Sequence, residues 1–311
     1  MKLKKKIYIT GVSGFIGSSL AKKCLESGHS VIGITRNSAS EISKQLKIKV
    51  IEADLLKEAN LEIESADVVI HCATANDILS KNINEGYSLS INGTSNLLEA
   101  SKRADISNFI FFSTAQVYGT ELKGCINEST ALNCKTTYGL NHYLGEELCK
   151  FYSDNHDFNS IVLRPSNVYG VPELNTVNRK TLVPMCFIEE AVKHGSITLR
   201  SSGKQMRNFI STDELGDIVL KILNDIPKGF SKINCGSNFN SSILDIAKIV
   251  ANCYEKNLGK KLIIDIEKNE PKISNIFEYN SNFSLSLPNK SISMKNIETT
   301  INRLLQKYKS N

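Results

Sequence analysis

The chain has 311 residues, of which 41% are hydrophobic and 23% are charged, an ordinary soluble composition that allows a large core. Its formal net charge of +6 is spread along the sequence, with Lys4 to Lys6 as the only tight basic run, so nucleic-acid binding has little support. No apolar run approaches the roughly 18 residues of a membrane span, and we expect neither a membrane segment nor a secretory leader.

The eight cysteines include no C-x-x-C pair. This spacing argues against a zinc site and against a disulfide framework. We therefore expect reduced thiols, a cytoplasmic location and no bound metal.

A buried strand is predicted over residues 6–10, and it runs directly into T-G-V-S-G-F-I-G. Gly11, Gly14 and Gly17 stand three residues apart where this strand gives way to a helical pattern over 15–27. Glycines at such a turn let a pyrophosphate approach the helix N-terminus, whose free N–H groups and dipole favour anions. The pattern predicts a dinucleotide site. The other loop residues that we assign to it are Ser13, Phe15 and Ile16.

The second predicted strand, residues 30–35, ends just before Arg36 and Asn37, where an NAD enzyme usually carries an acid for the ribose 2′-hydroxyl. No acid stands there, and Arg36 can instead take the 2′-phosphate of NADP. NADP(H) is therefore favoured, and NAD(H) stays open. Asp54 and Leu55 follow the third strand, and Asp54 is assigned either to the adenine amino group or to a helix cap.

The following segments continue the alternation of apolar runs and amphipathic stretches. Strands are predicted over 67–72, 108–113 and 160–164, with helices over 88–103 and 138–152. Such alternation predicts an α/β fold with a Rossmann-type, doubly wound parallel sheet.

The pattern loosens after Gly170, and residues 171–180 read as an active-site loop. A helix that starts near Asp213 is expected to return to the first domain, and S-S-I-L-D-I-A-K begins a smaller C-terminal lobe with a serine cap. The expected division is a dinucleotide-binding domain of residues 1–170 with 208–232, and a substrate-binding lobe of residues 171–207 and 233–311.

Tyr138 and His142 stand four residues apart on a predicted helix, so their side chains lie on one face. This spacing alone does not separate a proton-transfer pair from two ordinary surface residues. His71, in V-I-H-C-A, is interpreted as a packed residue without a catalytic role.

The chain resembles the extended short-chain dehydrogenase/reductase family, in its NAD(P)-dependent epimerase/dehydratase branch acting on nucleotide sugars. The resemblance covers nearly all of residues 7–225. It rests on six segments that occur in the family's order: T-G-x-x-G-F-I-G, D-V-V-I-H-C-A, N-G-T-S-N-L-L-E-A, F-F-S-T-A-Q-V-Y-G, Y-G-L-N-H and R-P-S-N-V-Y-G.

The resemblance implies a catalytic hydroxyl at Thr114, a proton-transferring phenol at Tyr138, and His142 in the place of the family's lysine. That lysine holds the nicotinamide ribose and lowers the pKa of the tyrosine by its charge. A histidine is mostly neutral at pH 7, so we expect His142 to bond the ribose and to supply less charge. Ser90 stands where the family usually has an asparagine of the same relay.

Family members that dehydrate a sugar carry an Asp-Glu pair after the motif threonine, where this chain has Ala115 and Gln116. This argues against a 4,6-dehydratase. A reductase of 4-keto sugars is favoured by Arg36, and a 4-epimerase with tightly held NAD is the alternative. A dinucleotide-binding sensor or scaffold that lost the relay is the hypothesis of another class.

The same resemblance assigns the remaining contacts. Asn167 and Arg207 are expected to meet the diphosphate of a nucleotide sugar, for which a guanidinium is well suited. Gln116 is expected near the sugar ring. The further cofactor contacts are assigned to Ala73, Thr74, Pro165 and Ser166. A homodimer through the helices of 88–103 and 138–152 is also expected, as is common in the family.

Overall fold

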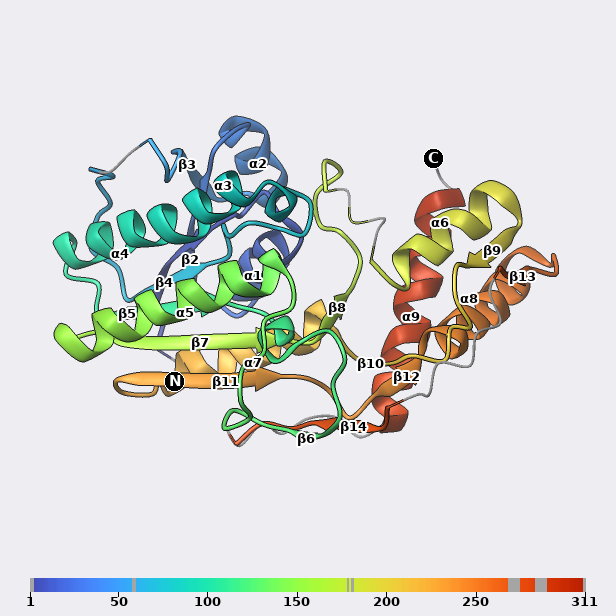
Figure 1. Cartoon of the computed structure of the whole chain (residues 1–311). Helices are drawn as coiled ribbons and strands as arrows, with labels where there is room; N and C mark the ends of the chain where they lie inside the picture. Colours follow the sequence, from blue (N-terminus) through green and yellow to red (C-terminus); the bar gives the residue numbers. More distant parts are fainter. Residues whose placement is uncertain are drawn as a thin grey trace.

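A seven-stranded sheet lies at the centre of the larger part of the molecule (Figure 1). The computed structural model describes residues 3–57, 60–177, 179, 182–267, 275–282 and 290–309. The strands are paired in parallel in the order β11-β7-β5-β4-β1-β2-β3. Their bounds are β1 Lys6–Thr10, β2 Ser30–Thr35, β3 Lys49–Glu52, β4 Val68–His71, β5 Asn108–Phe112, β7 Asn159–Pro165 and β11 Phe230–Cys235.

Helices cover both faces of this sheet, so the central strands are buried on two sides and read as continuous apolar runs. One face carries α1 (Phe15–Glu26), α2 (Ala39–Leu46) and α7 (Thr212–Asn224). The other face carries α3 (Ile83–Tyr87), α4 (Thr94–Arg103) and α5 (Thr137–Asn155). This is the predicted Rossmann-type α/β fold, and the prediction is confirmed.

The helix expected over 88–103 is not uniform. Residues Ser88–Gly93 (η2) form a wider π-helical turn, and the regular α4 begins only at Thr94. The Thr94 hydroxyl donates to the carbonyl oxygen of Ser90 at 2.7 Å, and Ser90 itself is fully buried. A π turn inside a helix often marks a functional site.

A second core lies in the C-terminal lobe, on the right of Figure 1. It packs α6 (Met185–His194), α8 (Ile243–Leu258) and α9 (Lys290–Lys309) around β9 (Ser196–Leu199), which pairs with β13 (Ile263–Ile266). The Ser242 hydroxyl accepts from the Asp245 N–H at 3.0 Å and so caps α8 as expected.

Two small sheets lie between the central sheet and this lobe (Figure 1). One contains β12 (Asn240–Ser242), β10 (Met206–Ser211) and β8 (Asn167–Tyr169); the other pairs β14 (Phe277–Tyr279) with β6 (Gly124–Ile126). Short 3₁₀ turns occur at η1 (Leu79–Lys81) and η3 (Ala115–Tyr118).

The helix expected near Asp213 is α7, which packs against α1. Residues 171–177 and 179 contain no helix or strand, while 178 and 180 of the loop expected over 171–180 lie outside the described residues, as do 268–274 and 283–289 of the expected lobe. In the described part of the chain, no helix has the length and apolarity needed to cross a membrane. These residues also include no cluster of three or more His, Cys, Asp or Glu arranged to hold a metal ion.

Candidate active site

A pocket of about 380 Å³ opens at the carboxyl ends of the central strands. Its wall includes Gly11 after β1, Thr74 after β4, Thr114 after β5 and Pro165 at the end of β7, and Phe277 of β14 lies on the lobe side. The crevice beyond the carboxyl ends of the strands is where doubly wound sheets bind ligands.

Most of the residues assigned from the sequence line this pocket. They are Gly11, Gly14, Phe15, Ile16, Gly17, Thr74, Thr114, Gln116, Tyr138, His142, Pro165, Ser166, Asn167 and Arg207. The structure brings these residues together, and their individual roles stay predictions. Six assigned residues do not line it: Ser13, Arg36, Asn37, Asp54, Leu55 and Ala73.

The glycine loop forms an open cradle because two of its positions have no room for a side chain. Gly11 has φ of +66°, and a Cβ there would lie 2.9 Å from the Cys72 carbonyl carbon. A Cβ at Gly17 would lie 2.3 Å from the Gly11 carbonyl oxygen. Helix α1 starts at Phe15 without a side-chain cap, so its first N–H groups are available to an anion.

The residues that lie outside the pocket have other contacts. Arg36 and Asn37 are exposed beyond the end of β2, while the Ser13 hydroxyl accepts from Thr35 at 2.9 Å. The Asp54 carboxylate accepts from the Leu56 N–H at 3.1 Å within a turn that follows β3. Leu55 packs in the core under α4. The backbone N–H of Ala73 donates to the Thr10 hydroxyl at 3.3 Å.

Thr114 and Tyr138 come together because α5 begins beside the end of β5. The Thr136 hydroxyl caps α5 by accepting from the Gly139 N–H at 3.0 Å, which places Tyr138 in the first turn. Burial raises the pKa of Tyr138, whereas contact with the Thr114 hydroxyl and the charge of Arg179 lower it. The two hydroxyls therefore face the same part of the pocket.

His142 lies one turn after Tyr138, with ring centroids 4.4 Å apart. Its Nδ1 donates to the Tyr138 carbonyl oxygen at 2.9 Å, because a carbonyl can only accept. Its Nε2 then accepts from the Thr74 hydroxyl at 3.1 Å. Burial lowers the pKa of His142 to about 4, although the bond to the Tyr138 carbonyl raises it. The imidazole is therefore neutral at pH 7, and Nε2 is an acceptor at the pocket wall.

Two buried polar residues, Ser90 and His71, form hydrogen bonds close to this site. The Ser90 hydroxyl accepts from the Ala75 N–H at 3.4 Å. His71 is fully buried, with Nδ1 2.7 Å from the Thr10 hydroxyl and Nε2 3.0 Å from the Thr94 hydroxyl. Burial lowers the pKa of His71 to about 3. Its contacts agree with the packed role expected from the sequence.

The assigned diphosphate contacts lie on neighbouring strands of one small sheet. Asn167 is on β8 and Arg207 is on β10, and the Asn167 side chain donates to the Asn208 carbonyl oxygen at 2.8 Å. Burial lowers the pKa of Arg207, while the charge of Glu121 raises it. Gln116 is exposed, and its Oε1 accepts from the Thr136 hydroxyl at 3.2 Å.

The comparisons with known proteins identify the family of this chain. The model of the NAD dependent epimerase/dehydratase family matches residues 7–236. The chain belongs to this family. The resemblance inferred from the six sequence segments is thereby confirmed.

Individual relatives match most of this chain. A putative UDP-glucose 4-epimerase of Methanocaldococcus jannaschii is 29% identical over 253 residues, which are 78% of this chain and 81% of that protein. The dTDP-D-glucose 4,6-dehydratase of Dictyostelium discoideum is 30% identical over 274 residues, covering 80% of this chain and 62% of that protein. A crystal structure of UDP-glucuronic acid 4-epimerase from Bacillus cereus in complex with NAD has a TM-score of 0.78 at 25% identity, covering 97% of this chain and 99% of that chain.

The pocket of this epimerase/dehydratase family member also contains residues that the sequence reading did not assign. Arg179 lines it and pairs with Asp77, with Nη1 and Oδ1 3.3 Å apart. Among the described lining residues, Asp77 carries the only carboxylate. Phe277 and Tyr279 reach the pocket from β14. Only the loosened pattern around 171–180 gave a signal for Arg179, and no motif marked β14.

Proposed function

We propose that this chain is a nucleotide-sugar 4-epimerase that uses a nicotinamide dinucleotide. The observation that carries the proposal is the Thr114–Tyr138 pair in a pocket whose only described carboxylate, Asp77, is ion-paired to Arg179. One phenol can exchange a proton at one carbon, whereas dehydration across two carbons needs a second acid or base. Relatives named as 4-epimerases support this alternative over the reductase favoured from the sequence.

The pocket has features that suit the proposed dinucleotide. The glycine loop has no side chain at Gly17, where a Cβ would clash with the Gly11 carbonyl oxygen. A pyrophosphate can therefore approach the backbone of the loop closely. The Ser166 hydroxyl oxygen is buried in the wall without a hydrogen-bond partner among the described residues. When bound, the nicotinamide supplies a place for the hydride of the sugar C4, from which it can return.

The chain's own groups handle the proton and the orientation. Tyr138 would remove the proton of the 4-hydroxyl as the C4 hydride leaves, and it would give the proton back to the ketone oxygen when the hydride returns to the opposite face of C4, which inverts that carbon. Thr114 orients that oxygen. His142 offers its neutral Nε2 to a ribose hydroxyl in place of the Thr74 hydroxyl that it binds here, and Asn167 and Arg207 hold the diphosphate. Arg179 supplies positive charge near Tyr138, which His142 does not at neutral pH.

The epimerase proposal favours NAD over NADP, because a cofactor that is reoxidised in each turnover need not exchange. Titrating NADPH and NADH by fluorescence tests the preference for NADP(H) that was predicted from Arg36. We also propose a cytoplasmic homodimer, no nucleic-acid partner, and the division into residues 1–170 with 208–232 and the remaining lobe.

The first experiment supplies the purified chain with UDP-glucose, UDP-galactose, UDP-glucuronic acid or dTDP-glucose and follows the products chromatographically. We expect interconversion of 4-epimers without net use of cofactor. Consumption of NADPH in proportion to an added nucleotide-linked 4-keto sugar would instead establish the reductase. Cofactor binding without either reaction would favour the sensor or scaffold.

We expect Tyr138→Phe to lower turnover by at least about 100-fold while cofactor affinity changes little, because the lost group acts in the proton step. The matched control is Tyr143→Phe, on the same helix but outside the pocket lining. Wild-type turnover in Tyr138→Phe would exclude the proposed role of the pair.

A further inference from the structure

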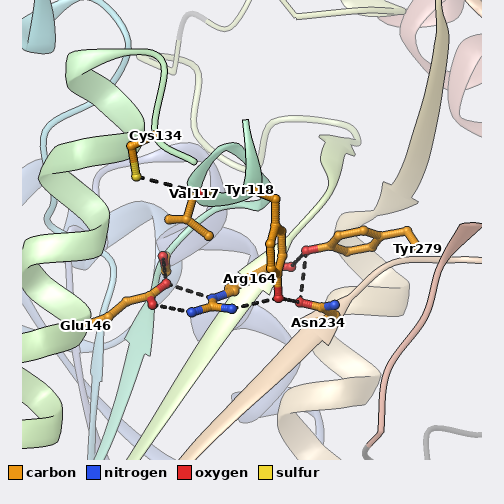
Figure 2. Close-up of polar contacts among 8 residues, drawn as sticks. Val117, Tyr118, Cys134, Glu146, Arg164, Asn234 and Tyr279 are labelled. Carbon is orange, nitrogen blue, oxygen red and sulfur yellow. Dashed lines mark hydrogen bonds and ion pairs between the residues drawn. The ribbon is translucent and has the colours of Figure 1, made fainter. Parts of the chain in front are cut away.

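A buried ion pair, drawn in Figure 2, lies next to residues that line the pocket. Arg164 on β7 is fully buried and makes two bonds to Glu146 of α5, Nε to Oε1 at 2.9 Å and Nη2 to Oε2 at 2.5 Å. Its Nη1 donates to the Tyr118 hydroxyl at 2.6 Å. The Ser113 hydroxyl donates to Glu146 Oε1 at 2.5 Å.

Stability alone is a weak explanation for this arrangement. Burying two charges costs several kcal/mol per ion, and well-packed apolar residues often replace such a pair without loss. The network is retained only if its polar groups are satisfied. Here the Tyr118 hydroxyl donates a hydrogen bond to Asn234 Oδ1 at 2.8 Å, so each group has a partner.

The position of the network relative to the reacting groups suggests what it does. Ser113 directly precedes Thr114, and Glu146 follows Tyr138 by eight residues on α5, about two turns along the same helix. Arg164 directly precedes the pocket residue Pro165. The bonds from Glu146 to Ser113 and Arg164 therefore fix three wall segments of the pocket to one another.

A second arm reaches the network from β14. Tyr279 of β14 donates its hydroxyl to the Arg164 carbonyl oxygen at 2.8 Å, and the same hydroxyl lies 3.2 Å from Asn234 Oδ1 (Figure 2). Burial raises the pKa of Tyr279 well above its ordinary value, so the phenol stays a donor. Tyr279 and Phe277 both line the pocket. The wall formed by β14 is thus tied to the end of β7.

We propose that this network is a positioning device with two separable arms. The Ser113–Glu146 arm holds Thr114 in line with Tyr138, and the Tyr279 arm holds the β14 wall against which the sugar nucleotide binds. The kinetic tests of this inference rest on the proposed function, because they measure turnover of a nucleotide sugar. The inference itself is that Ser113 and Tyr279 are positioning residues.

Hydroxyl deletions test the two arms, because removing Arg164 or Glu146 would leave an unpaired buried charge. Ser113→Ala should lower kcat roughly tenfold with KM nearly unchanged, since misalignment acts on the chemical step. Its control is Ser160→Ala, which removes a buried hydroxyl on β7 that has no partner among the described residues.

Tyr279→Phe should show the opposite pattern, with KM for the nucleotide sugar raised roughly five- to tenfold and kcat nearly unchanged. Tyr254→Phe serves as its control, because Tyr254 is a buried tyrosine of α8 outside the pocket lining. Equal effects of the two variants on kcat and KM, or no effect of either, would overturn the two-arm assignment.

Amide hydrogen exchange separates this inference from the proposed function, because it needs no substrate. Tyr279→Phe should speed exchange in residues 277–282 and leave 113–118 unchanged, whereas Ser113→Ala should do the reverse. If the wild-type chain converts no nucleotide sugar, the epimerase proposal fails and the exchange pattern still decides on the network. A uniform increase in both segments, or none, would refute it.

Discussion

At the scale of single residues, position 142 has a histidine where the proposed proton relay would have a lysine. His142 is buried, its Nδ1 is used by the Tyr138 carbonyl, and its Nε2 is an acceptor. A lysine would present three donors and a charge at this point. The Thr114 contact and Arg179 are therefore what lowers the pKa of Tyr138 against burial.

The neutral state of His142 predicts an acid-sensitive fold. Its pKa is about 4 when folded against an ordinary 6.5, so its contribution is present above pH 6.5 and is lost as pH falls toward 4. This difference corresponds to about 3 kcal/mol. Urea unfolding of His142→Gln should therefore show a shallower fall of stability over this interval. The exposed His194→Gln is the control, and an equal slope in wild type and His142→Gln would contradict the prediction.

Arg179 gives the second prediction at this scale. Thr114, Arg179 and Asp77 act on the pKa of Tyr138, and the neutral His142 ring lies 4.4 Å from the Tyr138 ring. Removing the guanidinium charge should raise the pKa of Tyr138, so the rising limb of kcat against pH should move to higher pH in Arg179→Gln. Arg179→Lys should keep the limb near its wild-type position.

The control for this shift is the exposed Arg200→Gln, in the other lobe. His142→Lys added to Arg179→Gln should move the limb back, because it returns a cation to the same helix face. A limb that stays in place in Arg179→Gln would show that the charge of Arg179 does not act on the proton step.

At the scale of elements, the sequence predicted the strands and helix caps that depend on residues close together in the chain. Buried apolar runs marked five strands of the sheet, and a serine cap marked α8. The π turn at Ser88–Gly93 was not predicted, because one extra residue in a helix leaves the apolar pattern almost intact. The pairing of β14 with β6 was not predicted for another reason. A strand of three residues is too short to show an alternating apolar pattern, and its partners lie about 150 positions away in the chain.

At the scale of the whole molecule, the site is made by two parts that the sequence joins only through long connections. Motifs predicted the sheet edge with Gly11, Thr114 and Tyr138, because these positions follow strands or open helices. They did not predict Tyr279, or the arginine–glutamate pair behind the pocket, because side chains far apart in sequence meet there only after folding. The wall opposite the glycine cradle is therefore a product of tertiary structure.

The surface of α5 carries the last prediction, which concerns assembly. Leu140, Leu144 and Phe151 follow one stripe of α5, a helix that packs against α4, and Phe151 is 56% exposed. Covering this stripe with a second copy removes apolar surface from water, so we expect a dimer in light scattering at micromolar concentration. Phe151→Glu should shift the protein from dimer to monomer, because burying the carboxylate in the dimer contact would remove its hydration. Ile263→Glu, at a residue 61% exposed in the other lobe, should leave the assembly unchanged. A wild-type monomer, or a dimer that resists Phe151→Glu, would mean that α5 faces solvent and that its leucines serve only the fold of the single chain.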